Sequence, residues 1–218
     1  STLFPYTTLF RSRTGGKLEE LSVEDLVADL EKLRKELGED KMVLLAHSMG
    51  TRLAYEYLRR YPDRVSALIL IGAFAPTAAA SEALGSMEDR GMAMLARPVV
   101  KEELARAGLD NLSKDASALA RTQARRLQFA SVNIVHVERW REFEGGRIYY
   151  NAEVGSQLSS SAPENWDVSA FIATRRIPIS VIQGDRDYVD PGASGWVALR
   201  DAKVPLSSCI QVKVVNRF

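Results

Sequence analysis

The 218-residue sequence has one cysteine, two histidines and almost no net charge, because 29 Lys and Arg residues balance 28 Asp and Glu residues. A single cysteine, Cys209, cannot form an internal disulfide, which favours the cytoplasm as the location. A net charge of +1 supplies no field that would concentrate nucleic acid. No apolar run approaches the ~20 residues needed to cross a bilayer, so we expect neither a nucleic-acid nor a membrane partner.

The composition is that of an ordinary globular protein, with 46% hydrophobic and 26% charged residues. This length suits one domain that carries an inserted subdomain. Two widely spaced histidines and one cysteine supply no recognised set of metal ligands, so we expect no metal and no cofactor. The oligomeric state stays open.

The chain divides into four parts. Residues 1–12 resemble a translated adapter peptide that is not part of the fold, although a genuine β-rich segment is the alternative. Residues 13–75 are predicted to form the first part of a core, and residues 177–218 its second part. Between them, residues 76–176 hold long helix-compatible stretches at 101–108 and 115–130, which predicts an inserted helical cap.

Short continuous apolar runs indicate strands that helices cover. Such runs occupy residues 42–46, 65–74, 179–183 and 209–215. Helical spacing of apolar residues predicts helices at 21–37, 51–61 and 195–202, the first with Ser22 as its N-cap and Gly38 as its stop. The alternation predicts an α/β fold with a mostly parallel sheet and helices on both faces.

The sequence Ala-His-Ser-Met-Gly at 46–50 joins a predicted strand to a predicted helix and nearly matches the pattern G-x-S-x-G. Small residues on either side of Ser48 permit a sharp turn whose strained backbone lifts the hydroxyl clear of the sheet. We predict Ser48 as a nucleophile and the Met49 N–H, at the start of the helix, as an oxyanion donor. The alternative is a small residue in a tight turn of a protein without catalysis.

Four segments now carry a family resemblance: Met-Val-Leu-Leu-Ala-His-Ser-Met-Gly at 42–50, Tyr-Pro-Asp-Arg-Val at 61–65, Leu-Ile-Leu-Ile-Gly at 68–72, and Gly-Asp-Arg-Asp at 184–187. With these the chain resembles the α/β-hydrolase fold family, and within it the proline iminopeptidases and related esterases. The resemblance implies a helical cap over Ser48 and a serine hydrolase that forms an acyl-enzyme. Its substrate would be a small molecule or peptide with an ester or amide bond, an N-terminal aminoacyl bond being one form.

The resemblance also implies the acid of the site. The family's acid matches Asp187, which would orient and support an imidazolium, and Asp185 is the reserve. Asp190 stands before Pro191 and a helical stretch, an arrangement typical of an N-cap with proline at the first helical position.

The base is harder to assign. His47 adjoins Ser48 and projects in a different direction, so we interpret it as structural. His136 lies in the predicted cap as a packing or pocket-lining residue, the alternative being that it swings into the site. In the family the base follows the last predicted strand, and we expect truncation before it at Phe218.

Truncation is expected at the other end too, where the family has several more strands and the second oxyanion N–H. Their loss would leave residues 42–46 as an exposed, aggregation-prone edge. We therefore expect this chain to be inactive or nearly so. A non-catalytic hydrolase-like binding protein is the alternative function.

Acids and aromatic residues mix in the predicted cap, which by default indicates a solvated acidic face beside core aromatics. The resemblance to iminopeptidases, whose cap carboxylates hold a substrate's α-amino group, makes Glu138 and Trp140 candidates for substrate binding, with Glu142 and Glu144 beside them. Nearby arginines offset these acids, which argues against a purely acidic pocket.

Overall fold

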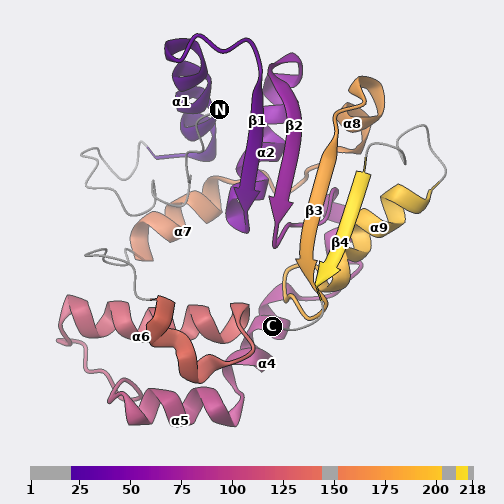
Figure 1. Cartoon of the computed structure of the whole chain (residues 1–218). Helices are drawn as coiled ribbons and strands as arrows, with labels where there is room; N and C mark the ends of the chain where they lie inside the picture. The colour runs from indigo at the N-terminus through magenta and orange to yellow at the C-terminus, as the bar shows by residue number, and fades with distance from the viewer. Residues whose placement is uncertain (1–20, 144–151, 203–209, 216–218) are drawn as a thin grey trace. The chain divides into compact units, whose positions relative to one another are not determined.

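The computed structural model describes residues 21–143, 152–202 and 210–215, and the chain divides into two compact units. The first unit holds the described residues up to Gly85 and those from Ala152 onward, and the second holds residues 86–143. The elements, labelled in Figure 1, are α1 Val23–Glu36, β1 Met42–His47, α2 Met49–Arg60, η3 Pro62–Arg64, β2 Val65–Ile71, α3 Ala78–Glu82, α4 Met87–Leu95, α5 Pro98–Arg106, α6 Ala118–Asn133, η4 Val137–Phe143, α7 Ala152–Ser161, α8 Ser169–Arg175, β3 Ile179–Gly184, η5 Pro191–Ala193, α9 Ser194–Asp201 and β4 Ile210–Val215.

The first unit is built on a sheet in which β1, β2, β3 and β4 lie in that order, all parallel. Ala46 pairs with Leu70, Leu70 with Val181, and Val181 with Val212. The predicted strands and their parallel arrangement are therefore confirmed, and β1 is an edge strand among the described strands; Cys209 lies outside the described residues. Because the strands are parallel, their carboxyl ends meet at one edge of the sheet (Figure 1).

Side chains alternate between the two faces of this sheet. Leu70 and Val181 are buried on the face against which α2 and α9 pack, behind the strands in Figure 1. Val43, Leu45 and Ile182 point to the other face and are 57%, 43% and 37% exposed. The predicted α/β fold class with its parallel sheet and packed helices is thus confirmed.

Local signals define the helix ends. The Ser22 side chain accepts a hydrogen bond from the Asp25 N–H, and Gly38 takes a positive φ of 70° just past α1, as its predicted roles require. Helix α2 begins at Met49, two residues earlier than its apolar periodicity predicts, because Ser48 itself makes the turn from β1. The helix predicted at 195–202 is α9.

The second unit is helical. Ser86 and Ser117 accept backbone N–H groups at the starts of α4 and α6, and Leu127, Val137 and Trp140 lie in its apolar core. The unit falls inside the predicted insertion at 76–176, whereas α3, α7 and α8 group with the sheet.

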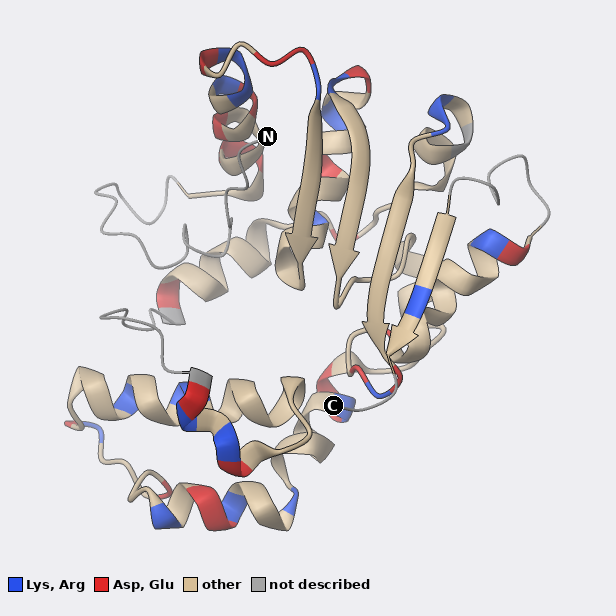
Figure 2. Cartoon of the chain, in the orientation of Figure 1, with Lys and Arg blue, Asp and Glu red and all other residues tan. Residues whose placement is uncertain are grey.

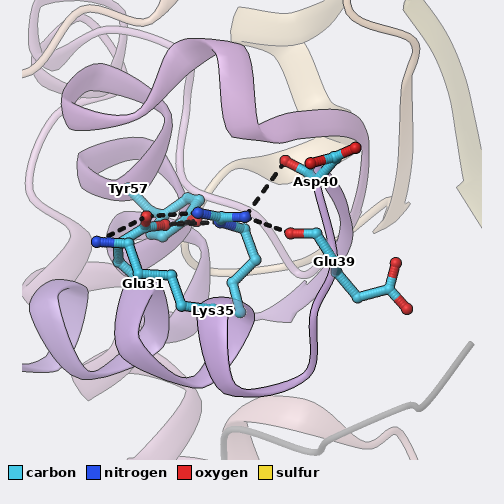
Figure 3. Close-up of polar contacts among 6 residues, drawn as sticks. Glu31, Lys35, Glu39, Asp40 and Tyr57 are labelled. Carbon is cyan, nitrogen blue, oxygen red and sulfur yellow. Dashed lines mark hydrogen bonds and ion pairs between the residues drawn. The ribbon is translucent and has the colours of Figure 1, made fainter.

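Charged residues are concentrated on helices and loops, and the strands are almost entirely tan in Figure 2. The sequence of β4 includes Lys213. One buried ion pair of the first unit joins Glu31 and Arg34 of α1, in the cluster drawn in Figure 3. Arg34 Nη2 lies 2.7 Å from Glu31 Oε1, and its Nη1 donates to the carbonyl of Glu39. The Tyr57 hydroxyl of α2 donates to Glu31 Oε2 at 2.8 Å. The cluster therefore ties α1 to α2 and to the turn before β1.

We predict that Glu31→Gln lowers the free energy of unfolding by about 2 kcal/mol, because it removes the charge that the buried Arg34 needs. The hydrogen bond from Arg34 is the largest cause that lowers the pKa of Glu31 from its ordinary 4.5 to about 2. A carboxyl whose pKa is lower in the folded state stabilises the fold above its unfolded pKa. Wild type should therefore lose this contribution as the pH falls from 4.5 towards 2.

Urea unfolding across this pH range, with the exposed Glu36→Gln on the same helix as control, checks the prediction. The stability difference between wild type and Glu31→Gln should shrink on acidification. A difference that stays constant from neutral pH to pH 2 would show that the Glu31 charge is not what stabilises this cluster.

Candidate active site

Ser48 forms the turn between β1 and α2 and has a φ of +52°. For a residue with a side chain this region is strained by ~1–3 kcal/mol, so the turn must be held by its surroundings. The Ser48 N–H donates to the carbonyl of Ile71 at 3.0 Å. The Ser48 carbonyl accepts from both the N–H and the hydroxyl of Thr51, at 2.8 and 2.7 Å. The strained backbone predicted for this turn is confirmed.

Met49 is the first residue of α2. The first N–H groups of a helix have no acceptor inside it, and they lie at the positive end of the helix dipole. The Ser48 side chain makes no capping hydrogen bond to them. The turn can thus present a hydroxyl together with the start of a helix suited to stabilising an oxyanion, and the oxyanion role of Met49 stays a prediction.

Asp187 follows β3 and therefore lies at the same edge of the parallel sheet as Ser48. Its Oδ1 accepts the Val189 N–H at 2.8 Å, which fixes the carboxylate. Burial raises the pKa of Asp187, and the Val189 N–H and the charge of His47 oppose this effect. The structure brings the predicted nucleophile and acid to one sheet edge, and their catalytic roles stay predictions.

Gly72, at the end of β2, separates His47 from Asp187. Its φ is +55°, and a methyl group added there would lie 3.3 Å from Asp187 Oδ2 and 3.6 Å from His47 Nε2. The side chains of His47, at the end of β1, and Asp187, after β3, thus both lie against Gly72. Burial lowers the pKa of His47, and the negative charge of Asp187 opposes that effect.

Asp185, the reserve acid, and Asp190, the predicted N-cap, both follow β3 in the same loop as Asp187. The Asp185 N–H donates to the Val215 carbonyl at 3.2 Å, which continues the pairing of β3 with β4. Asp190 precedes Pro191 at the start of η5, as predicted, but its side chain makes no N-cap bond to the backbone. Instead its Oδ1 accepts the Ser194 hydroxyl at 2.8 Å.

The substrate-binding candidates belong to the second unit. Trp140 is 2% exposed, and its indole Nε1 lies 3.3 Å from the buried Glu103 carboxylate, so its burial does not favour a binding role. Glu138 is exposed and lies 3.0 Å from His136 Nδ1. Glu142 pairs with Arg139, and Glu144 lies outside the described residues.

Three further residues lie at this edge of the sheet and were not predicted from the sequence as part of the site: Thr51, Gly72 and Gln183. Gln183 gave the clearest signal, since it is a lone amide side chain in the apolar run of β3 and is 1% exposed. Gly72 gave none beyond its position directly after a strand, and Thr51 none beyond its position in the first turn of α2.

The described residues contain no group of three or more His, Cys, Asp or Glu side chains that could hold a metal ion. Within the same ranges, no helix combines the length and apolar character that crossing a membrane requires.

The α/β-hydrolase fold family matches residues 10–213, and this chain belongs to it. An α/β fold family hydrolase from Bacillus anthracis shares the fold, with a TM-score of 0.62 at 15% identity over 94% of this chain and 70% of that one. An α/β hydrolase from a deep-sea metagenome library has a TM-score of 0.53 at 17% identity over 94% of this chain and 67% of that one.

Two curated relatives match a shorter region. Proline iminopeptidase from Neisseria meningitidis is 41% identical over 64 residues, which are 29% of this chain and 21% of that protein. Serine protease Hip1 from Mycobacterium tuberculosis is 39% identical over 66 residues, which are 30% of this chain and 13% of that protein. The matches thus cover less than a quarter of either relative.

Proposed function

We propose that this chain carries the nucleophile and the acid of a serine hydrolase that cleaves an ester or amide bond through an acyl-enzyme on Ser48. The observation that carries the proposal is the backbone of Ser48, which has a positive φ at a strand-to-helix turn. Such strain costs stability, persists where the surrounding structure holds it, and is concentrated at active sites. The position of Asp187 at the same sheet edge supports the assignment.

The chemistry follows from this geometry. The Ser48 hydroxyl attacks the carbonyl carbon as a base takes its proton, and the oxyanion that forms accepts the Met49 N–H. The tetrahedral intermediate then collapses, and the leaving group departs with that proton while the acyl group stays on Ser48. Water attacks the acyl-enzyme in a second cycle of the same kind and regenerates the hydroxyl. Asp187 supports the positive charge that the base acquires.

The 218 residues contain two histidines, and neither is assigned as the base. His47 lies beside Gly72 at the strand end, where we interpret it as structural. His136 belongs to the second unit, where its Nδ1 lies beside Glu138. A serine hydroxyl is a poor nucleophile without a base, so we expect this chain by itself to turn over slowly.

We propose a small-molecule or peptide substrate. The similarity to a proline iminopeptidase favours an N-terminal aminoacyl bond as one form, and the similarity to a serine protease favours an amide more generally. An activated aryl ester is a suitable probe because it needs the least help to its leaving group.

Labelling with a fluorophosphonate probe in the presence of imidazole tests this function. Trypsin cleavage after Lys41 and Arg52 yields the peptide 42–52, in which Ser48 is the only serine. We expect the mass of the phosphonyl group on this peptide, and no such mass in the Ser48→Ala variant. Folded protein that stays unlabelled, or labelling confined to other peptides, would favour the non-catalytic binding protein.

A further inference from the structure

Side chains from several elements hold the backbone of residues 72–75, the segment that follows β2. The Phe74 carbonyl accepts the Tyr55 hydroxyl at 2.6 Å and the Trp196 indole N–H at 2.9 Å. The Ala75 carbonyl accepts the Trp166 indole N–H at 2.9 Å. This segment leaves the sheet and would otherwise bury unpaired backbone groups, so these contacts fix its path.

Gln183 of β3 holds the start of the segment. The Gly72 N–H still donates to the Ile182 carbonyl at 3.0 Å, in register with the sheet. Ala73 is fully buried, and its backbone groups are hydrogen-bonded by the side chain of Gln183 in place of the backbone of β3. Its Oε1 accepts the Ala73 N–H at 2.7 Å, and its Nε2 donates to the Ala73 carbonyl at 3.3 Å. A side-chain amide matches both backbone groups of one residue here, which no hydrocarbon side chain could do.

Thr51 of α2 joins the same segment to the turn at Ser48. Its hydroxyl donates to the Ser48 carbonyl at 2.7 Å and accepts the Phe74 N–H at 3.3 Å. Thr51 is fully buried, so water does not compete for these contacts. Hydrogen bonds thus link Ser48 through Thr51 to Phe74, and link the preceding residue Ala73 to Gln183 at the end of β3.

Gly72 connects these hydrogen bonds to the candidate active site. Gly72 precedes the held residues directly and lies against the Asp187 carboxylate and the His47 ring. A shift of the segment would move Gly72 and change the space that these two side chains share. Displacements of about 1 Å can reduce the rate of a catalysed reaction by roughly 100-fold.

We propose that Thr51 and Gln183 are positioning residues that set Asp187 relative to Ser48 by holding residues 72–74. The proposal rests on the proposed function of Ser48 and Asp187. Neither residue is proposed to contact substrate, and each acts through the backbone that it binds.

The first measurement is the rate of imidazole-dependent, Ser48-dependent hydrolysis of an aryl ester by the whole chain. We expect Thr51→Val to reduce kcat by about 10- to 100-fold with a smaller change in KM, and Gln183→Met to act in the same direction. Thr51→Ser, which keeps the hydroxyl, should stay close to wild type. Thr122→Val is the matched control, because Thr122 is also buried and donates to a helix carbonyl, that of Ala118, in the second unit.

The second measurement needs no catalysis. The NMR titration of the His47 ring is followed in wild type and in each variant. Asp187→Asn should lower the pKa of His47 in the wild-type background, because it removes a negative charge that raises it. In the Thr51→Val background the same substitution should change the pKa of His47 by less.

The two measurements distinguish a failure of the proposed function from a failure of the positioning role. If wild type shows no Ser48-dependent hydrolysis, the proposed function is wrong, while the His47 titrations still decide the positioning role. If folded Thr51→Val responds to Asp187→Asn as strongly as wild type does, the positioning role is wrong. A loss of activity in Thr122→Val equal to that in Thr51→Val would also overturn it, because a general loss of stability would then explain both.

Discussion

Replacing Ser48 with alanine abolishes the excess rate at which this chain and imidazole together hydrolyse an activated aryl ester, leaving the rate of imidazole in buffer. This result is expected because free imidazole can take the Ser48 proton that no assigned base of this chain takes. A base held in place acts at an effective concentration of roughly 10⁵ M or more, so free imidazole recovers only a small part of an ordinary enzyme rate. Aryl ester hydrolysis followed by absorbance at several imidazole concentrations measures this excess.

Ser66→Ala is the control for this experiment. Ser66 is exposed and lies near the start of β2, at the opposite end of the strand from the candidate site. It should keep the wild-type excess rate. An excess that survives in Ser48→Ala would mean that another group of the chain is acylated, and turnover at ordinary enzyme rates without imidazole would show that the chain already supplies a base.

Replacing Gly72 with valine should remove most of the Ser48-dependent hydrolysis and also destabilise the fold. A β-branched residue at a φ of +55° is strained by ~1–3 kcal/mol. Its Cβ would in addition lie 3.3 Å from Asp187 Oδ2, so the carboxylate must move. We expect a loss of roughly 100-fold in the imidazole-dependent rate, because a displaced acid no longer supports the charged base.

Gly38→Val separates backbone strain from contact with the acid. Gly38 has a similar φ of +70°, but an added Cβ there meets nothing within 4 Å. Thermal unfolding should show a loss of stability in both variants, and the ester assay a loss of activity in Gly72→Val alone. Equal activity of the two variants would show that the space between His47 and Asp187 does not matter to hydrolysis.

The fold could be predicted from the sequence where one physical signal dominates. Continuous apolar runs located all four described strands because strands of a parallel sheet are rich in apolar residues at successive positions, even though Val43 and Leu45 of β1 are exposed. The turn at Ser48 was predictable because small neighbours, a strand before and a helix after are its chemical requirements. Ser22 and Gly38 marked the ends of α1 through the hydrogen bonding and backbone freedom that helix ends need.

Contacts between residues distant in the sequence could not be predicted. Thr51 and Gln183 meet the segment after β2 through pairings that span 23 and 110 residues, and no local pattern encodes them. A mixture of acids and aromatic residues likewise does not tell a binding surface from a core. Trp140 proved to be buried beside Glu103, which the sequence alone could not show.

In the proposed function Ser48 and Asp187 act at one place, and a crystal structure of the phosphonylated chain tests this most directly. We expect phosphorus bonded to Ser48 Oγ, a phosphonyl oxygen within hydrogen-bond distance of the Met49 N–H, and the Asp187 carboxylate at the same sheet edge. Phosphorus bonded to a different residue, or a phosphonyl group turned away from the start of α2 and from Asp187, would contradict it.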